Sequence, residues 1–285
     1  MAIDTRAGFT VRRMNRGEVD LIREWATAEG WNPGLHDAGC FYVTDPDGFF
    51  LGELNGEPVA CISCVSYDTS FGFLGQYIVR SDCRGQGYGI QVWRAGMDHL
   101  GDRNVGLDGV VSQQENYLKS GFRYTHSHVR YRGVGGGEGA AGVVPLSDVP
   151  FDALAAYDRE HFPAPRPGFL QSWIAIPGAV ALGCARSGKL VGYGVIRPAV
   201  EGFKIGPLFA DGPEVAEALF RSLLASVPNQ PVVIDAPDET ANPHVGELVR
   251  QHAWTEVFRT ARMYTKAAPR LPLAQIYGVT SLELG

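Results

Sequence analysis

The order of hydrophobic and polar residues in the first half of the chain predicts a mixture of helices and strands. An early stretch, residues 16–31, is predicted to form an amphipathic helix because its hydrophobic residues recur at helical spacing: Val19, Ile22, Trp25 and Ala26. Residues 48–68 form two β-rich runs around Asn55-Gly56, a pair typical of hairpin turns. A third strand is expected at 71–80.

The pattern continues in the same way after residue 80. The remaining elements expected in this half are a helix at 89–100, a short buried strand at 105–112, a helix at 113–120 ended by Gly121, and a strand at 122–133. Hairpins mixed with helices in this order predict an α+β fold, in which helices flank a mainly antiparallel sheet.

The second half of the chain repeats this plan after a linker-like stretch at 133–142, GVGGGEGAAG. Matching positions lie 131 to 133 residues apart: Gly75 and Gly206, Gly56 and Gly188, Tyr131 and Tyr264. Four elements return in the same order, which indicates duplication of one unit. We therefore predict two tandem domains, 8–132 and 143–285, joined by the linker 133–142.

Composition and charge exclude several functional classes. The chain is 45% hydrophobic and 20% charged with a formal net charge of −6, so every segment is expected to fold. The sequence has no run rich in lysine and arginine, so nucleic acid is not an expected partner. It has no long apolar segment, and its first residues lack the apolar core of a signal peptide, so we expect a soluble, cytoplasmic protein that does not associate with membranes.

The five cysteines and seven histidines do not predict a metal or redox site. Cys61 and Cys64 form a C-x-x-C pattern, but they lie in a predicted strand, where residues three apart point to opposite faces of the sheet. The histidines show no ligand spacing with cysteine or carboxylate residues. No metal is expected.

Candidate chemistry is concentrated in the segment that joins the third strand to the long helix. Here Gly85, Gly87 and Gly89 alternate with other residues, and Arg80 and Arg84 precede them. A turn that needs only positive φ requires one glycine, not three. A dinucleotide fingerprint requires its third glycine one residue later, and a P-loop ends in G-K-[ST], so neither nucleotide motif matches this spacing. The backbone N–H groups of a helix N-terminus favour anions, so a bound phosphate is the preferred interpretation.

The second half lacks this arrangement. At the matching helix start it has Asp211 and Glu214, which would repel a phosphate. We therefore expect one anion site per chain, in the first half.

The motif Arg84-Gly85-Gln86-Gly87-Tyr88-Gly89, after a strand that ends in Val79, resembles the pyrophosphate loop Q/R-x-x-G-x-G/A of the GNAT superfamily of acetyl-CoA-dependent N-acetyltransferases. The resemblance implies that the backbone of residues 84–89, together with Arg80, binds the pyrophosphate of acetyl-CoA. It also implies that the main chain of Ile78 and Val79 holds the acetyl group and the pantetheine arm.

A second motif, Asn116-Tyr117-Leu118-Lys119-Ser120-Gly121-Phe122, resembles the Y-x-x-x-G-F pattern of the same family. The resemblance implies that Tyr117 protonates the departing thiolate as a general acid and that Asn116 contributes to the coenzyme site. Over nearly all 285 residues the chain resembles a tandem two-GNAT-domain subgroup (YitH/HolE-like).

The general base and the acceptor are not specified by these motifs. Many members of the family carry a glutamate in the strand before the loop, where this chain has Gln76, which orients an amine or a water but accepts no proton at neutral pH. The nearest carboxylates, Asp68 and Asp108, have ordinary structural roles as alternatives, and a water chain is a third possibility. Asp108 and Gln76 are the candidate substrate-binding residues.

The expected reaction is transfer of an acetyl group from acetyl-CoA to a primary amine of a small molecule, such as an amino sugar, a polyamine or an antibiotic-like amine. Acceptor-pocket candidates in the second half are Trp173, Tyr193, Lys204 and Asp235, with a rim at 161–169. The alternative is a non-catalytic acyl-CoA-binding sensor, suggested by the absent glutamate. The chain is expected to be a monomer or a homodimer.

Overall fold

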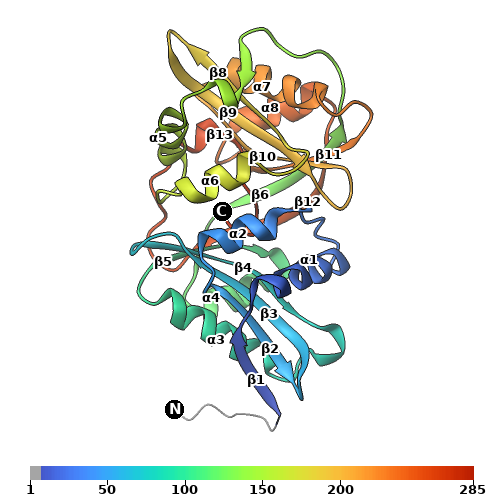
Figure 1. Cartoon of the computed structure of the whole chain (residues 1–285), viewed down its shortest axis with the longest axis vertical. Helices are drawn as coiled ribbons and strands as arrows, with labels where there is room; N and C mark the ends of the chain where they lie inside the picture. Colours follow the sequence, from blue (N-terminus) through green and yellow to red (C-terminus); the bar gives the residue numbers. More distant parts are fainter. Residues whose placement is uncertain (1–7) are drawn as a thin grey trace.

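The computed structural model describes residues 8–285 as two lobes that share one sheet, with the end of the chain lying between them (Figure 1). The first lobe is formed by β1 (Phe9–Arg13), α1 (Val19–Ala28), α2 (Asp37–Thr44), β2 (Phe49–Leu54), β3 (Glu57–Ser66), β4 (Phe71–Val79), α3 (Tyr88–Leu100), β5 (Asn104–Val110) and α4 (Gln114–Lys119). β6 (Arg123–Val134) then leads into the second lobe and extends two residues into the expected linker.

The second lobe repeats the order of elements. It contains β7 (Val143–Pro145), α5 (Phe151–His161), α6 (Pro167–Ile174), β8 (Val180–Arg186), β9 (Lys189–Pro198), β10 (Phe203–Ala210), α7 (Pro213–Ala225), β11 (Pro231–Pro237), α8 (Pro243–Gln251), β12 (Thr255–Tyr264) and β13 (Ile276–Gly278). The α+β class and the mainly antiparallel sheet predicted from the sequence are confirmed. α2, α5 and α6 lie in stretches for which the sequence pattern predicted no helix.

Local sequence features explain several element boundaries. Asn15 and Glu18 form a capping box immediately before α1, which buries one hydrophobic stripe that includes Ile22. The turn between β2 and β3 has φ of 53° at Asn55 and 86° at Gly56, the positive values that a two-residue hairpin of this type requires. The helix and the hairpin predicted from these residues are confirmed.

The two lobes exchange their last strands. Along the sheet the order is β4-β5-β12-β6-β11-β10, so β12 of the second half pairs with β5, and β6 of the first half pairs with β11. A buried ion pair crosses each of these contacts: Arg262 with Asp108, and Arg130 with Asp235. Each half-sheet is therefore completed by a strand from the other half of the sequence.

Two pairs of parallel strands separate part of the way along their length. β4 and β5 pair from Phe71 to Leu74 only, although β4 continues to Val79 and β5 to Val110. In the second lobe, β10 and β11 pair only from Phe203 to Ile205, and β13 then pairs with the rest of β10. The wedge between the separated strands is thus filled by the chain's own backbone in the second lobe. In the first lobe the β4–β5 pairing simply ends.

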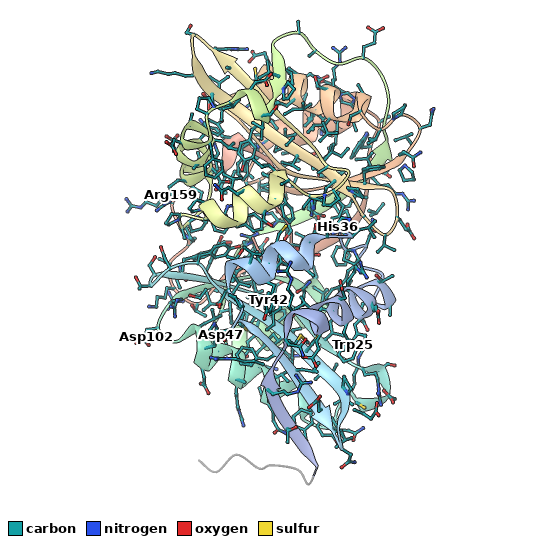
Figure 2. The ribbon with its side chains drawn as sticks, in the orientation of Figure 1. Trp25, His36, Tyr42, Asp47, Asp102 and Arg159 are labelled. Atoms are coloured by element: carbon teal, nitrogen blue, oxygen red, sulfur yellow. The ribbon has the colours of Figure 1, made fainter. Side chains whose placement is uncertain are left out.

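Helix α2 packs between the lobes. Phe41 stacks on Trp173 of α6 with ring centroids 6.0 Å apart, while Tyr42, labelled in Figure 2, contacts Phe49 of β2 at 5.8 Å. Asp37 at the start of α2 forms a buried ion pair with Arg197 of β9. One cluster of buried hydrophobic side chains therefore contains residues of both lobes.

The cysteine prediction holds for β3. Cys61 belongs to the core cluster beneath α1 and α2, whereas Cys64 packs beneath α3, so the two thiols lie on opposite faces of the sheet. Residues 1–7, part of the stretch compared with a signal peptide, lie outside the described residues. None of the helices in residues 8–285 has the length and hydropathy that crossing a bilayer requires.

Candidate active site

A cavity of about 1090 Å³ occupies the wedge between β4 and β5. One wall is the end of β4, from Leu74 to Val79, and the opposite wall is the end of β5, from Leu107 to Val110. The segment before α3 and the start of that helix form one end, and α4 forms part of the side. Of the residues predicted for the site from the sequence, the cavity is lined by Gln76, Ile78, Val79, Arg84, Gly85, Gly87, Tyr88, Gly89, Asp108, Asn116 and Tyr117.

The loop before α3 presents backbone donors to this cavity. Gly85 and Gly87 have φ of 74° and 81°, the left-handed region that favours glycine, and Gly87 is the N-cap of α3. A Cβ atom at Gly85 would meet no atom within 4 Å, so the loop is open there. The first turn of α3 has no acidic residue and no side-chain cap, and its residues Gly89 and Ile90 line the cavity. This end of the cavity is suited to an anion.

The third glycine of the motif has a packing role. A Cβ atom at Gly89 would overlap the hydroxyl of Tyr77 and lie 2.9 Å from Cγ2 of Val79. Gly89 therefore lets α3 approach β4 closely. The three glycines thus meet two needs, backbone conformation at Gly85 and Gly87, and close helix–strand packing at Gly89.

The two arginines of the motif already have partners. Arg84 donates from Nε to the carbonyl of Val79 at 2.8 Å and forms an ion pair with Glu29 at the end of α1. Arg80 turns to Asp82, with Nε 2.7 Å from Oδ1, and does not line the cavity. Gln86 also lies outside it and donates to the carbonyl of Asp82. Of the two arginines, Arg84 is therefore the one placed at the cavity.

The end of β4 offers main-chain groups to the cavity. Ile78 pairs with Cys61 of β3 on one side, while β5 pairs with β4 no further than Leu74. Gln76 has φ of 51° at a β-bulge, where two residues of β4 oppose one of β3. The residues from Gly75 to Val79 therefore line the cavity on the side of β4 where β5 no longer pairs with them.

Tyr117 is positioned by aromatic packing. Its ring stacks on Trp93 of α3 with centroids 5.9 Å apart and lies so close to β5 that a Cβ atom at Gly109 would overlap it. Burial, with a smaller contribution from Tyr77, raises the pKa of Tyr117 to about 12. The phenol therefore stays protonated at neutral pH. Asn116 is exposed and donates to Gln113.

Asp108 faces the cavity but is held by other side chains. Oδ1 lies 2.8 Å from Nδ1 of His128, and Oδ2 accepts from Arg262. Burial acts to raise the pKa of Asp108, but the charges of Arg262 and His128 outweigh it and lower the pKa. A carboxylate held in this way is a weak proton acceptor. Asp68 caps the turn before β4 and lies away from the cavity.

The acceptor-side candidates in the second lobe lie elsewhere. Trp173, Tyr193, Lys204 and Asp235 are all buried, and none lines the large cavity. From the expected rim at 161–169, Phe162 and Pro163 line a separate, much smaller cavity of about 30 Å³. The strands β6 and β12 and the end of the chain contribute cavity residues that sequence patterns did not predict: Arg130, Phe258, Thr260, Leu282 and Glu283, together with Trp31 after α1.

Within residues 8–285 no group of histidine, cysteine and carboxylate side chains is arranged to hold a metal ion. The five cysteines are buried and free. The cavity is lined by three tyrosines, Tyr77, Tyr88 and Tyr117, and by a small number of other polar side chains.

Comparison with known proteins identifies both halves of the chain. Residues 18–122 match the "Acetyltransferase (GNAT) family" and residues 154–278 match the "Acetyltransferase (GNAT) domain". Holothin acyltransferase from Pseudoalteromonas sp. (strain SANK 73390) is 34% identical over 280 residues, which cover 97% of this chain and 95% of that protein.

Solved structures agree at the level of the fold. A protein from Pyrococcus horikoshii superposes with a TM-score of 0.84 at 22% identity, covering 100% of this chain and 99% of that one. A tandem GNAT protein from the clavulanic acid biosynthesis pathway superposes with a TM-score of 0.63 at 12% identity, covering 91% and 99%. With two matched domains and a relative that is similar along almost its whole length, the chain belongs to the GNAT acetyltransferase family and is a tandem-domain acyltransferase.

Proposed function

We propose that the protein transfers an acetyl group from acetyl-CoA to a primary amine of a small molecule, in the cavity between β4 and β5. The observation that carries this proposal is the cavity itself. The start of α3, the end of β4 and Tyr117 all line one space of about 1090 Å³. Members of the GNAT family use acetyl-CoA, which supplies an acetyl group on an activated thioester.

The loop residues fit the pyrophosphate of acetyl-CoA. Gly85 and Gly87, both with positive φ, line a space into which the first turn of α3 brings no acidic side chain. Arg84 lies at the same place and adds positive charge, while its pairing with Glu29 fixes its orientation. We propose that the backbone of residues 84–89 provides most of the binding, because Arg80 and Gln86 point away.

The chain's own groups then act on the acceptor and the leaving group. We propose that the main chain of Ile78 and Val79, which line the cavity, orients the thioester carbonyl. Tyr117, whose pKa of about 12 keeps its proton in place, donates that proton to the departing sulfur. Holding both substrates in register provides a large part of the acceleration.

We propose that coenzyme binding is confined to the first half of the sequence, 8–132, and that 143–285 forms a domain without a coenzyme site. In the second lobe Glu214 lies in the first turn of α7, and β13 fills the wedge. Because β12 and the end of the chain line the cavity, the second half still contributes to the acceptor side.

A thiol-release assay with acetyl-CoA and a panel of primary amines tests this proposal. Release of coenzyme A that depends on one class of amine, with the N-acetyl product seen by mass spectrometry, is the expected result. Binding of acetyl-CoA without turnover across aliphatic, aromatic and sugar amines would instead favour the non-catalytic sensor.

A further inference from the structure

The end of the cavity away from the coenzyme loop contains two buried oxygen atoms without a hydrogen-bond partner. One is Oε1 of Gln76 on the β-bulge of β4, and the other is Oε2 of Glu283 near the end of the chain. Each side chain is 6% exposed. Burying an acceptor without a donor is unfavourable, and it is more so for a carboxylate. Two such oxygens in one cavity indicate a ligand that brings N–H groups.

The end of the chain packs on β4 at the residue next to Gln76. A Cβ atom at Gly75 would overlap the carbonyl oxygen of Glu283, so only glycine allows this approach. Leu282 and Leu284 anchor the segment in the core on either side of Glu283. The carboxylate is thus held by main-chain packing beside the residue that precedes Gln76.

The surrounding charges leave Glu283 partly unpaired. Its Oε1 lies 3.9 Å from Nζ of Lys204, which also lies 3.7 Å from Asp235, and Lys204 makes no hydrogen bond. Burial and the nearby Arg130 lower the pKa of Lys204. Arg130 is itself engaged by both oxygens of Asp235 and by the carbonyl of Trp31.

The other carboxylates of the cavity are engaged by cations. Glu29 pairs with Arg84, and Asp108 is held by Arg262 and His128. Of the cavity carboxylates in the described chain, Glu283 is the one with a buried oxygen that has no hydrogen-bond partner.

We propose that Glu283 and Gln76 form the acceptor subsite, which binds a primary amine carried on a compact, largely apolar body, and that Glu283 takes the proton from the amine nitrogen. This inference rests on the proposed acetyltransferase function. A primary amine has two N–H bonds, one for each oxygen, and its lone pair remains free to attack.

The step balances as follows. The amine nitrogen forms a bond to the acetyl carbon while the carbon–sulfur bond breaks. The nitrogen loses one proton to Oε2 of Glu283, and the sulfur gains one from the hydroxyl of Tyr117. Exchange with solvent returns both side chains to their starting states, and the products are the N-acetyl amine and free coenzyme A thiol.

The walls of the subsite define the rest of the acceptor. Trp31, Phe258 and Leu282 line the same cavity and bring apolar side chains to it. A single carboxylate oxygen is available, so one amine is accommodated and a second cationic group is not. We therefore infer that monoamines with aromatic or aliphatic bodies are acetylated faster than polyamines or amino sugars.

Glu283→Gln tests this assignment because it keeps the size of the side chain and removes its charge. We expect kcat for the best amine to fall by about 100-fold or more, the usual contribution of a general base, while the dissociation constant for acetyl-CoA stays within about twofold. The pH profile of kcat/KM should also change shape. The matched control is Glu214→Gln, which removes an exposed carboxylate at the start of α7. It should leave kcat, the dissociation constant for acetyl-CoA and the pH profile unchanged.

Gln76→Met tests the second oxygen, because methionine keeps the length of the side chain without an acceptor. An increase in KM for the amine of about 5- to 10-fold is expected, the loss typical of one neutral hydrogen bond. If Glu283→Gln does not fold, Glu283→Asp keeps the charge beside Lys204, and its kcat should fall with the melting temperature preserved.

The outcomes separate the two proposals. No turnover of any amine by the wild-type protein would refute the proposed function itself. Turnover by the wild type with Glu283→Gln retaining kcat and pH profile, or faster acetylation of polyamines than of monoamines, would overturn the acceptor subsite while leaving acetyl transfer intact.

Discussion

The two lobes contain the same wedge between parallel strands, but only the first lobe keeps it open. In the first lobe β4 and β5 separate after Leu74, and the space between them is the large cavity. In the second lobe β10 and β11 separate after Ile205, and β13 enters between them, where Gly278 packs against Ile234. In the proposed function, this repeated fold element is the coenzyme-binding cavity in one copy, whereas the chain's own backbone fills it in the other.

The helices that begin at the two wedges, α3 and α7, also differ at their N-termini. α3 begins at a left-handed glycine, with no acidic residue in its first turn. α7 begins after Gly212 in extended backbone, with a proline and Glu214 in its first turn. The proline removes one N–H donor, and the glutamate places a negative charge at this end of the helix. These differences, together with the filled wedge, support the proposal that the second copy binds no coenzyme.

Among the variants that test this comparison, Gly87→Asp is expected to have the largest effect, a loss of affinity for acetyl-CoA. It places a negative charge at the N-cap of α3, where the pyrophosphate is proposed to bind, so affinity for acetyl-CoA should fall by at least about 1000-fold. Isothermal titration measures the loss. Gly87→Asn introduces similar backbone strain without the charge and should lose much less, while Gly212→Asp at the start of α7 should leave binding unchanged. Equal losses in Gly87→Asp and Gly212→Asp would refute the assignment of the site to the first lobe.

Ile276→Ala tests the role of β13, the strand that fills the wedge of the second lobe. Ile276 is buried at 4% exposure in the strand that closes the second lobe, so the free energy of unfolding should fall by about 2 to 4 kcal/mol. Acetyl-CoA binding should keep its affinity and stoichiometry, because α7 still carries Glu214. Chemical denaturation measures the first quantity and titration the second, with the exposed Val200→Ala as control. If the variant gained a second acetyl-CoA site, the filling of the wedge by β13, and not the charge of Glu214, would be what prevents binding in the second lobe.

Tyr117→Phe tests the protonating group of the open wedge. We expect kcat to fall by about 100-fold with little change in acetyl-CoA affinity. Because burial raises the pKa of Tyr117 to about 12, the phenol stays protonated across the working range. The ratio of wild-type to Tyr117→Phe rates should therefore be constant from pH 7 to about pH 10, the pKa of an ordinary tyrosine. Tyr124→Phe, at an exposed tyrosine of β6, is the control; a ratio that declines above pH 8 would contradict the role.

Local patterns in the sequence predicted much of the fold. The hairpin at Asn55-Gly56, the long helix at 89–100 and the duplication all depend on residues close together in the chain or on repeated order, and the structure contains each of them. The glycine loop was found because glycine has few reasons to alternate at a helix start.

The strand exchange was not predictable in this way. β6 and β12 have similar patterns of hydrophobic residues, and such a pattern specifies that a strand has a buried face, not which neighbour it pairs with. β13 has only three residues, too few to show an alternation. The sheet order is thus a property of long-range packing.

The candidate site was predictable on the coenzyme side and not on the acceptor side. Gln76, Tyr117 and the loop at 84–89 lie within about 40 residues of one another in sequence, inside recognisable motifs. Glu283 reaches the same cavity from the far end of the chain, and its role depends on the absence of a side chain at Gly75. Residue type alone suggested an acceptor role for four residues of the second half, and all four are buried in the core: Trp173, Tyr193, Lys204 and Asp235.

The stoichiometry of acetyl-CoA binding tests the comparison of the two wedges most directly. Isothermal titration of the wild-type protein should give one molecule of acetyl-CoA per chain, and Gly87→Asp should remove it without exposing another site. Two molecules per chain, or one that survives Gly87→Asp, would contradict the account in which only the wedge between β4 and β5 binds the coenzyme.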